Sequence, residues 1–204
     1  MSSQYLKIGF LASGSGSSAR AITAAIAAGE LPGEVRLMIS NNKSAAALEF
    51  AREQGLPTLC IPTQADPVAA DERIAAAMAA HGVELIVMSG YLRRLGPATL
   101  ARYSGRILNI HPGPLPEFGG EGMYGRRVHE AVLAAGVPAS GIVIHLVDEE
   151  YDHGAPVARK TVPVEPGDKP EDLEARVRAA EPGFFVETLQ RIARGELALP
   201  PHAA

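Results

Sequence analysis

Short apolar runs alternate with longer amphipathic segments along the first half of the chain. The apolar runs predict buried strands, and turn residues separate each run from the helical segment that follows. The predicted strands are Ile8–Leu11, Val35–Ile39, Thr58–Ile61, Leu85–Met88 and Arg106–Ile110. The predicted helices are Ala19–Ala28, Ala45–Gln54, Pro67–His81 and Pro97–Tyr103. This alternation predicts an α/β fold in which a parallel sheet carries helices on both faces.

The second half of the chain has a different pattern. Gly141–Val147 and Ala155–Lys160 flank a turn-rich acidic stretch, which predicts an antiparallel hairpin added to the sheet. Residues from Glu171 to about Gly195 predict a long final helix, although Pro182 lies within it. No repeat or linker is found, so we expect a single domain over residues 1–204.

Composition narrows the class of partner. Hydrophobic residues make up 47% of the chain, charged residues 21%, and the net charge is -4, which gives no basic surface for nucleic acid. No apolar run approaches the roughly 20 residues of a membrane span, and the first residues lack a secretory signal pattern. The single cysteine, Cys60, excludes a disulfide framework and fits a reducing cytoplasm. We interpret Cys60 as a buried strand residue.

Asn109 and His111 lie two positions apart, directly before the proline-rich stretch Pro112–Pro116. Residues i and i+2 of an extended strand point to the same face, so the amide and the imidazole can be directed at one small group. An amide donor beside a titratable imidazole suits a developing oxyanion and a proton transfer. The alternative interpretation is a strand end with a solvent-exposed histidine.

The loop Ser13–Ser18 follows the first strand and opens the first helix. Backbone N–H groups at a helix N-terminus bind phosphate, and glycines let the backbone approach an anion closely. The spacing matches neither the dinucleotide nor the Walker fingerprint. The loop therefore favours a monophosphate site over a plain tight turn.

The loop Asp148–Gly154 contains four carboxylates within five residues. Such a run is a solvated loop or a cation site, but the spacing of a calcium loop is absent. One carboxylate placed against His111 would instead favour the imidazolium form. His145 lies in an apolar strand and is interpreted as a structural residue.

Four of these segments are expected at one edge of the sheet, since ligands of open α/β sheets bind at the carboxyl ends of the strands. They are Ser13–Ser18, Ser89–Leu95, Asn109–Pro116 and Asp148–Gly154. Their convergence predicts a ligand site more strongly than any one of them.

The chain resembles the phosphoribosylglycinamide formyltransferases, folate-dependent enzymes of purine synthesis, from about Lys7 to Glu196. The segments that carry the resemblance are Leu11–Ser18, Ser40–Asn41, Ser89–Arg93, Asn109–Pro112, Leu115–Pro116 and Asp152–Gly154. The resemblance implies a Rossmann-like formyltransferase fold. It also implies transfer of a formyl group from 10-formyltetrahydrofolate, a co-substrate, to the amine of 5-phosphoribosyl-glycinamide, without a metal. We expect a monomer or a homodimer with no nucleic-acid or membrane partner.

The resemblance also assigns residues. Asn109 and His111 match the pair that stabilises the oxyanion, and Asp152 matches the carboxylate that supports the histidine. Glu181 matches a residue that contacts the glycinamide substrate. The matched phosphate loop comprises Ser15, Gly16, Ser17 and Ser18. The matched folate-binding residues are Leu92, Arg93, Arg94, Leu95, Asn109, Asp148, Glu149, Glu150, Tyr151 and Asp152.

The chain departs from the family pattern at a few positions. Many members have asparagine in place of Ser15 and Ser18, and a basic residue near Pro67 that meets the folate tail. Glu117–Gly125 is a glycine-rich variant of a common loop, or a surface loop without ligand contact.

Several alternatives remain open. On the same fold the chain could be a formyltetrahydrofolate hydrolase or a sugar-amine formyltransferase. Methionyl-tRNA formyltransferases need a further domain and a basic surface. A non-catalytic domain that binds a phosphometabolite is the rival from another class, and Asn109, His111 and Asp152 together argue against it. A dehydrogenase is disfavoured by the broken dinucleotide fingerprint.

Overall fold

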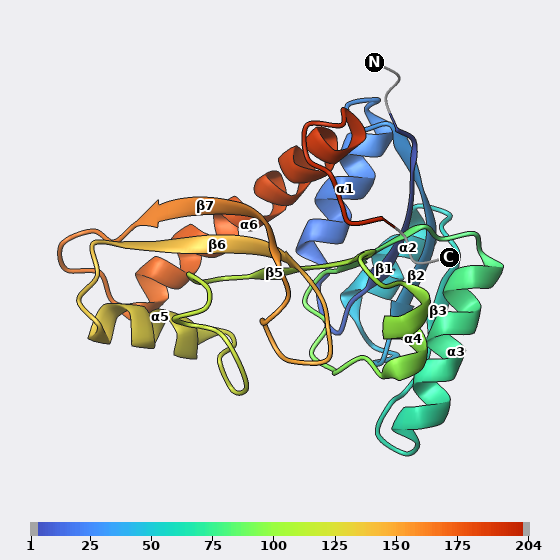
Figure 1. Ribbon diagram of the computed structural model, residues 1–204, viewed down its shortest axis with the longest axis horizontal. Coiled ribbons are helices and arrows are strands. Elements are labelled where there is room, and N and C mark those ends of the chain that lie inside the picture. Colours follow the sequence, from blue (N-terminus) through green and yellow to red (C-terminus); the bar gives the residue numbers. More distant parts are fainter. Residues whose placement is uncertain (1–3, 202–204) are drawn as a thin grey trace.

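Seven strands form one sheet through the centre of the computed structural model, which describes residues 4–201 (Figure 1). The strands are β1 (Leu6–Leu11), β2 (Gly33–Ser40), β3 (Thr58–Cys60), β4 (Leu85–Met88), β5 (Ile107–His111), β6 (Ala139–Leu146) and β7 (Pro156–Pro163). The helices are α1 (Ser17–Ala27), α2 (Ala46–Glu53), α3 (Pro67–Ala80), α4 (Pro97–Arg102), α5 (Arg126–Ala134) and α6 (Pro170–Ala193).

The strand order is β3-β2-β1-β4-β5-β6-β7. Strands β1 to β5 pair in parallel, whereas β6 pairs antiparallel with β5 and with β7. The expected mostly parallel sheet with an antiparallel hairpin is thus confirmed. The chain adds β2 and β3 on one side of β1 and β4 and β5 on the other, so the switch point lies between β1 and β4. Such a switch point opens a crevice at the carboxyl ends of the strands.

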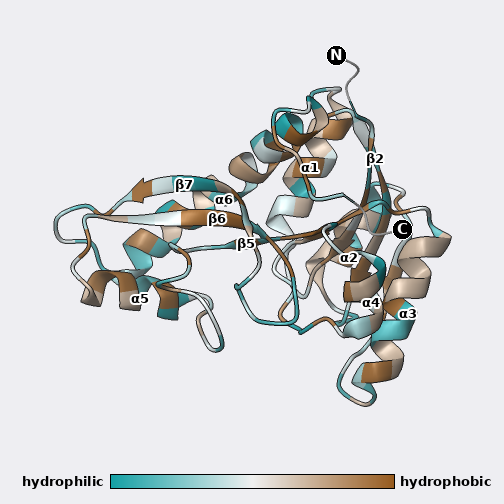
Figure 2. Cartoon of the chain, viewed as in Figure 1, coloured by the Kyte–Doolittle hydropathy of each residue, from teal (hydrophilic) through white to brown (hydrophobic). Residues whose placement is uncertain are grey.

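Two apolar layers cover the sheet because side chains of a strand alternate between its faces. Phe10 of β1 packs in the layer that contains residues of α1, α2, α5 and α6. The next residue, Leu11, packs in the layer that contains residues of α3 and α4. Figure 2 shows the central strands as mainly hydrophobic and the loop between β6 and β7 as hydrophilic. The helices on both faces are therefore as predicted.

Three details differ from the sequence predictions. Helix α5 was not predicted, because it presents only Val128 and Val132 as buried apolar positions among polar neighbours. Ser17 and Ser18 belong to the first turn of α1 rather than to the loop before it. Cys60 is only half-buried, because β3 is an edge strand. Within residues 4–201, no helix has the length and apolar character to cross a membrane.

Candidate active site

Ser13 joins the loop after β1 to the loop after β4. Its hydroxyl donates to Asn41 Oδ1 at 2.6 Å and accepts from the backbone N–H of Leu92 at 2.9 Å. The backbone N–H of Ser13 donates to the carbonyl of Gly90 at 3.1 Å. The predicted phosphate loop and the predicted folate segment are therefore held side by side. Ser13 itself was not assigned a role from the sequence.

Gly16 stands at the N-cap of α1 with φ +64°. A Cβ at this position would approach Ala47 Cβ to 2.9 Å, so both conformation and space require glycine. Ser15 and Ser17 are exposed, whereas Ser18 is only 2% exposed. Together with the dipole of the 11-residue helix, this arrangement suits a phosphate.

Asn109 of β5 lies opposite His145 of β6 in the antiparallel register. Asn109 Nδ2 is 3.2 Å from His145 Nε2, and His145 Nδ1 is 2.8 Å from the carbonyl of Leu146. A carbonyl only accepts, so the neutral ring carries its proton on Nδ1 and accepts the Asn109 amide at Nε2. The second N–H of that amide is left for another acceptor. His145 thus orients Asn109, a role that the sequence analysis missed because it depends on the register.

His111 is buried between two acceptors. Its Nδ1 is 3.3 Å from Asp152 Oδ2, and its Nε2 is 2.7 Å from the carbonyl of Phe118. The ring is 3% exposed, so the interpretation as a solvent-exposed histidine is wrong. The expected contact between His111 and a carboxylate of the acidic loop is present, and Asp152 supplies it.

Asp152 has φ +55°, alone among the described non-glycine residues in the left-handed region. This strained conformation turns its carboxylate inward to the histidines. Burial opposes its ionisation, but contacts with His111 and His145 and the N–H of Gly120 hold the pKa of Asp152 well below its usual range. His145 donates to Asp152 only when both of its ring nitrogens are protonated. With neutral His145, the donors are therefore His111 and Gly120, whose N–H lies 3.0 Å from Oδ2.

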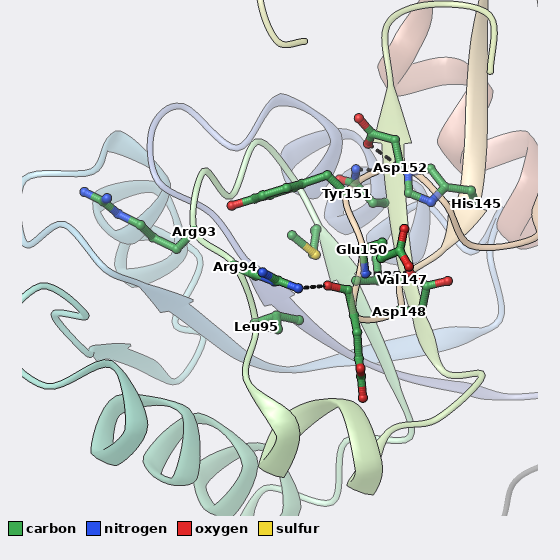
Figure 3. A pocket seen from close by; sticks show the side chains of 12 residues that line it. Arg93, Arg94, Leu95, His145, Val147, Asp148, Glu150, Tyr151 and Asp152 are labelled. Carbon is green, nitrogen blue, oxygen red and sulfur yellow. Dashed lines mark hydrogen bonds and ion pairs between the residues drawn. The ribbon is translucent and has the colours of Figure 1, made fainter. Parts of the chain in front are cut away.

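A cavity of about 40 Å³ opens beside this cluster. Figure 3 shows its walls, and the lining residues are Met88, Arg93, Arg94, Leu95, Asn109, His145, Val147, Asp148, Glu149, Glu150, Tyr151 and Asp152. All the predicted folate-binding residues are therefore brought together here except Leu92, whose backbone meets Ser13 and whose side chain is 68% exposed.

Arg94 joins the two walls of the cavity. Its guanidinium donates to the carbonyl of Glu149 and lies 5.9 Å from the centre of the Tyr151 ring (Figure 3). The loop Asp148–Gly154 also contains internal hydrogen bonds. Asp148 accepts from the backbone N–H of Glu150 and pairs with His153, each at 2.9 Å, and the pKa of His153 is raised by the hydrogen bond to Asp148.

Glu181 of α6 interacts electrostatically with His111. Burial raises the pKa of Glu181 to about 7, although the charges of Arg178 and His111 act in the opposite direction. A carboxyl group with such a pKa exchanges protons near neutral pH, which is typical of functional sites. Over residues 4–201, no group of three or more His, Cys, Asp or Glu side chains is arranged to hold a metal ion.

Comparison with known proteins identifies the family. The family model described as formyl transferase matches residues 6–189. The chain belongs to the formyl transferase family. It is 32% identical to the phosphoribosylglycinamide formyltransferase of Escherichia coli, over 98% of this chain and 92% of that protein. It is 37% identical to the chloroplastic phosphoribosylglycinamide formyltransferase of Arabidopsis thaliana, over 91% of this chain.

The chain spans only 65% of the length of the Arabidopsis relative. Among solved formyl transferases, the phosphoribosylglycinamide formyltransferase of Coxiella burnetii superposes with a TM-score of 0.87 and 34% identity, over 98% of this chain and 92% of that chain. The family expected from the sequence motifs is thus confirmed, together with its fold. The residue roles taken from the resemblance stay predictions.

Proposed function

We propose that the protein transfers the formyl group of 10-formyltetrahydrofolate to the amine of 5-phosphoribosyl-glycinamide. The product is formylglycinamide ribonucleotide, an intermediate of de novo purine (IMP) biosynthesis. The observation that carries the proposal is the cluster of Asn109, His111 and Asp152 beside the cavity. It combines an amide donor, an imidazole and a carboxylate that stays ionised, and acyl transfer to an amine uses these three groups.

The neutral amine attacks the formyl carbon, a C–N bond forms, and the carbonyl electrons move to oxygen. The free N–H of Asn109 donates to this oxyanion, and the positive charge of a protonated His111 stabilises it. Loss of one oxyanion donor typically costs about 10² to 10³ in rate. The attacking nitrogen, now cationic, gives its proton to water, the C=O bond re-forms, and the bond to the folate nitrogen breaks. The folate nitrogen takes a proton from His111 by way of water, and Asp152 supports the imidazolium until that proton leaves.

The other predicted residues serve binding. Ser15 to Ser18 hold the substrate phosphate at the N-terminus of α1, and Glu181 contacts the glycinamide part. Arg93 to Leu95 and Asp148 to Asp152 enclose the folate rings. The cavity of about 40 Å³ holds a few water molecules at most, so the loop Asp148–Asp152 must move outward to admit a bicyclic ring.

A formyl-release assay tests the proposed function. Purified protein is mixed with 10-formyl-5,8-dideazafolate, with and without 5-phosphoribosyl-glycinamide, and absorbance follows the deformylated folate. We expect release only when the glycinamide is present. Release without it would instead indicate a hydrolase, and no release in either mixture would contradict formyl transfer to this amine.

A second prediction concerns the histidine. His111→Ala should retain the fold and lower turnover by at least about 10². Near-wild-type turnover would contradict the mechanism. The compartment and the assembly belong to the proposal as well: the single cysteine favours a reducing cytoplasm, and we expect a monomer or a homodimer.

A further inference from the structure

The glycine-rich segment after β5 touches both members of the His111–Asp152 pair. The carbonyl of Phe118 accepts from His111 Nε2 at 2.7 Å, and the N–H of Gly120 donates to Asp152 Oδ2 at 3.0 Å. These two backbone groups lie only two residues apart. The segment Phe118–Gly120 therefore contacts both His111 and Asp152.

Each contact has a chemical consequence. The Phe118 carbonyl and the Asp152 carboxylate both accept, so together they fix the orientation of the His111 ring and keep Nδ1 facing Asp152. The Gly120 N–H cannot titrate in this range. It keeps one donor on the Asp152 carboxylate even while His111 has given up its proton.

The sequence of the segment fits this approach. A Cβ on Gly119 would overlap Leu115 Cδ2 and come to 3.0 Å from Asp152 Cβ. Gly120 has φ +98°, a conformation that residues with a side chain rarely adopt. The side chain of Phe118 packs against the apolar layer below α5 and α6, which anchors the segment.

We propose that Phe118–Gly120 is a positioning segment of the active site, which fixes the orientation of the His111 ring and holds the Asp152 carboxylate through backbone groups. The inference deepens the proposed function and rests on it for the reaction that is measured. Formyl transfer accordingly requires this segment in place, and displacing it removes both contacts together.

Two glycine variants test the segment, each with a matched control. Gly119→Ala adds a Cβ where there is no room, and Gly183→Ala adds one in open space on α6. Gly120→Ala disturbs a left-handed position in the segment, and Gly136→Ala disturbs a left-handed position in open space. If Gly119→Ala does not fold, the comparison of Gly120→Ala with Gly136→Ala still tests the positioning role.

Kinetics give the first readout. We expect Gly119→Ala and Gly120→Ala to lower kcat by about 10-fold to 100-fold while each KM changes by less than about 3-fold, because the reacting groups are misplaced and substrate binding is not. The two controls should keep wild-type kcat. An unchanged kcat in both segment variants, or a loss confined to KM, would overturn the proposal.

The second readout does not use the reaction. Nitrogen-15 NMR of the unliganded protein should show a hydrogen-bonded His111 Nε2 in the wild type and in both controls, and loss of this hydrogen bond in the segment variants. If formyl transfer fails in the wild type while the Nε2 signals follow the prediction, the proposed function is wrong and the positioning role stands. An Nε2 hydrogen bond that is unchanged in the segment variants would overturn the positioning role itself.

Discussion

Two carboxyl groups interact electrostatically with His111, and their surroundings shift their pKa values in opposite directions. Asp152 is held ionised by donors that converge on it, and its pKa is lowered. Glu181 has no side-chain hydrogen bond assigned to it within the described chain, and burial raises its pKa to about 7. Both groups lose solvent, so the difference comes from the supply of donors.

The local backbone explains why the donors differ. Asp152 lies in a strained turn that points its carboxylate at His111 and at the N–H of Gly120. Glu181 lies in the middle of α6, where every nearby backbone N–H is already used in the helix. One carboxyl group thus stays ionised beside an imidazole, and the other can gain or lose a proton near neutral pH.

Asp152→Asn removes the negative charge of one of the two carboxyl groups and keeps the shape of its side chain. We expect turnover to fall by about 10³ or more, because the amide cannot stabilise the imidazolium and offers an uncharged acceptor to His111. The acid limb of the rate profile should also change. Steady-state kinetics across pH measure both effects.

Asp168→Asn is the matched control for this variant. Asp168 is also a carboxylate held ionised, by Arg176 at 2.6 Å and 2.8 Å, but it lies in the turn before α6. Its substitution should leave turnover unchanged. Equal losses in the two variants would mean that Asp152 acts through stability and not through His111.

Glu181→Gln fixes the other carboxyl group in its neutral form. We expect KM for the glycinamide substrate to rise by about 10-fold, consistent with loss of one hydrogen bond to a charged group, while KM for the folate stays the same. Saturation curves for each substrate separate the two effects. A change in KM for the folate alone would mean that Glu181 does not contact the glycinamide substrate.

The same variant should change how stability depends on pH. In the unfolded chain Glu181 ionises near its ordinary value of 4.5, whereas the folded protein keeps the proton until about pH 7. The folded state binds more protons between these values, so this group makes stability fall as pH rises through that window. Glu181→Gln should therefore lose less stability than the wild type between pH 5 and pH 8. Urea midpoints at both pH values measure it, and identical pH dependence in the two proteins would contradict the raised pKa.

Arg94→Leu disturbs the loop that carries Asp152 without touching Glu181. The guanidinium ties the loop to the facing wall while the cavity is too small for folate. Loss of the Arg94 contacts raises the fraction of molecules in which the loop Asp148–Asp152 is open. We therefore expect the apparent folate affinity to increase by about 2-fold to 5-fold. Fluorescence titration with a folate analogue measures this, with Arg94→Lys as the charge-retaining control. Weaker folate binding in Arg94→Leu would mean that the arginine side chain binds the folate.

The sequence was sufficient to predict elements that depend on local pattern. The buried strands and α3 follow from apolar spacing and from Pro67 at the start of the helix. Asn109 and His111 were expected on one face of a strand, and both contact the same cluster around Asp152.

The partners of these residues could not be predicted, because they lie far away in the sequence. His145 meets Asn109 only through the register of β5 with β6. The contacts of Phe118 and Gly120 depend on how a glycine-rich loop folds back onto the acidic loop. The pKa of Glu181 depends on how deeply α6 packs, which composition does not reveal.

The central claim is that Asp152 is ionised while Glu181 keeps its proton up to near neutral pH, and carbon-13 NMR tests it directly. The unliganded protein, labelled at the side-chain carboxyl carbons, is titrated from about pH 4 to about pH 9. Asp152 should keep the chemical shift of a carboxylate throughout, whereas Glu181 should titrate with a midpoint near 7. Two ordinary titrations near pH 4 would contradict the account, because neither carboxyl group would then be tuned by its surroundings.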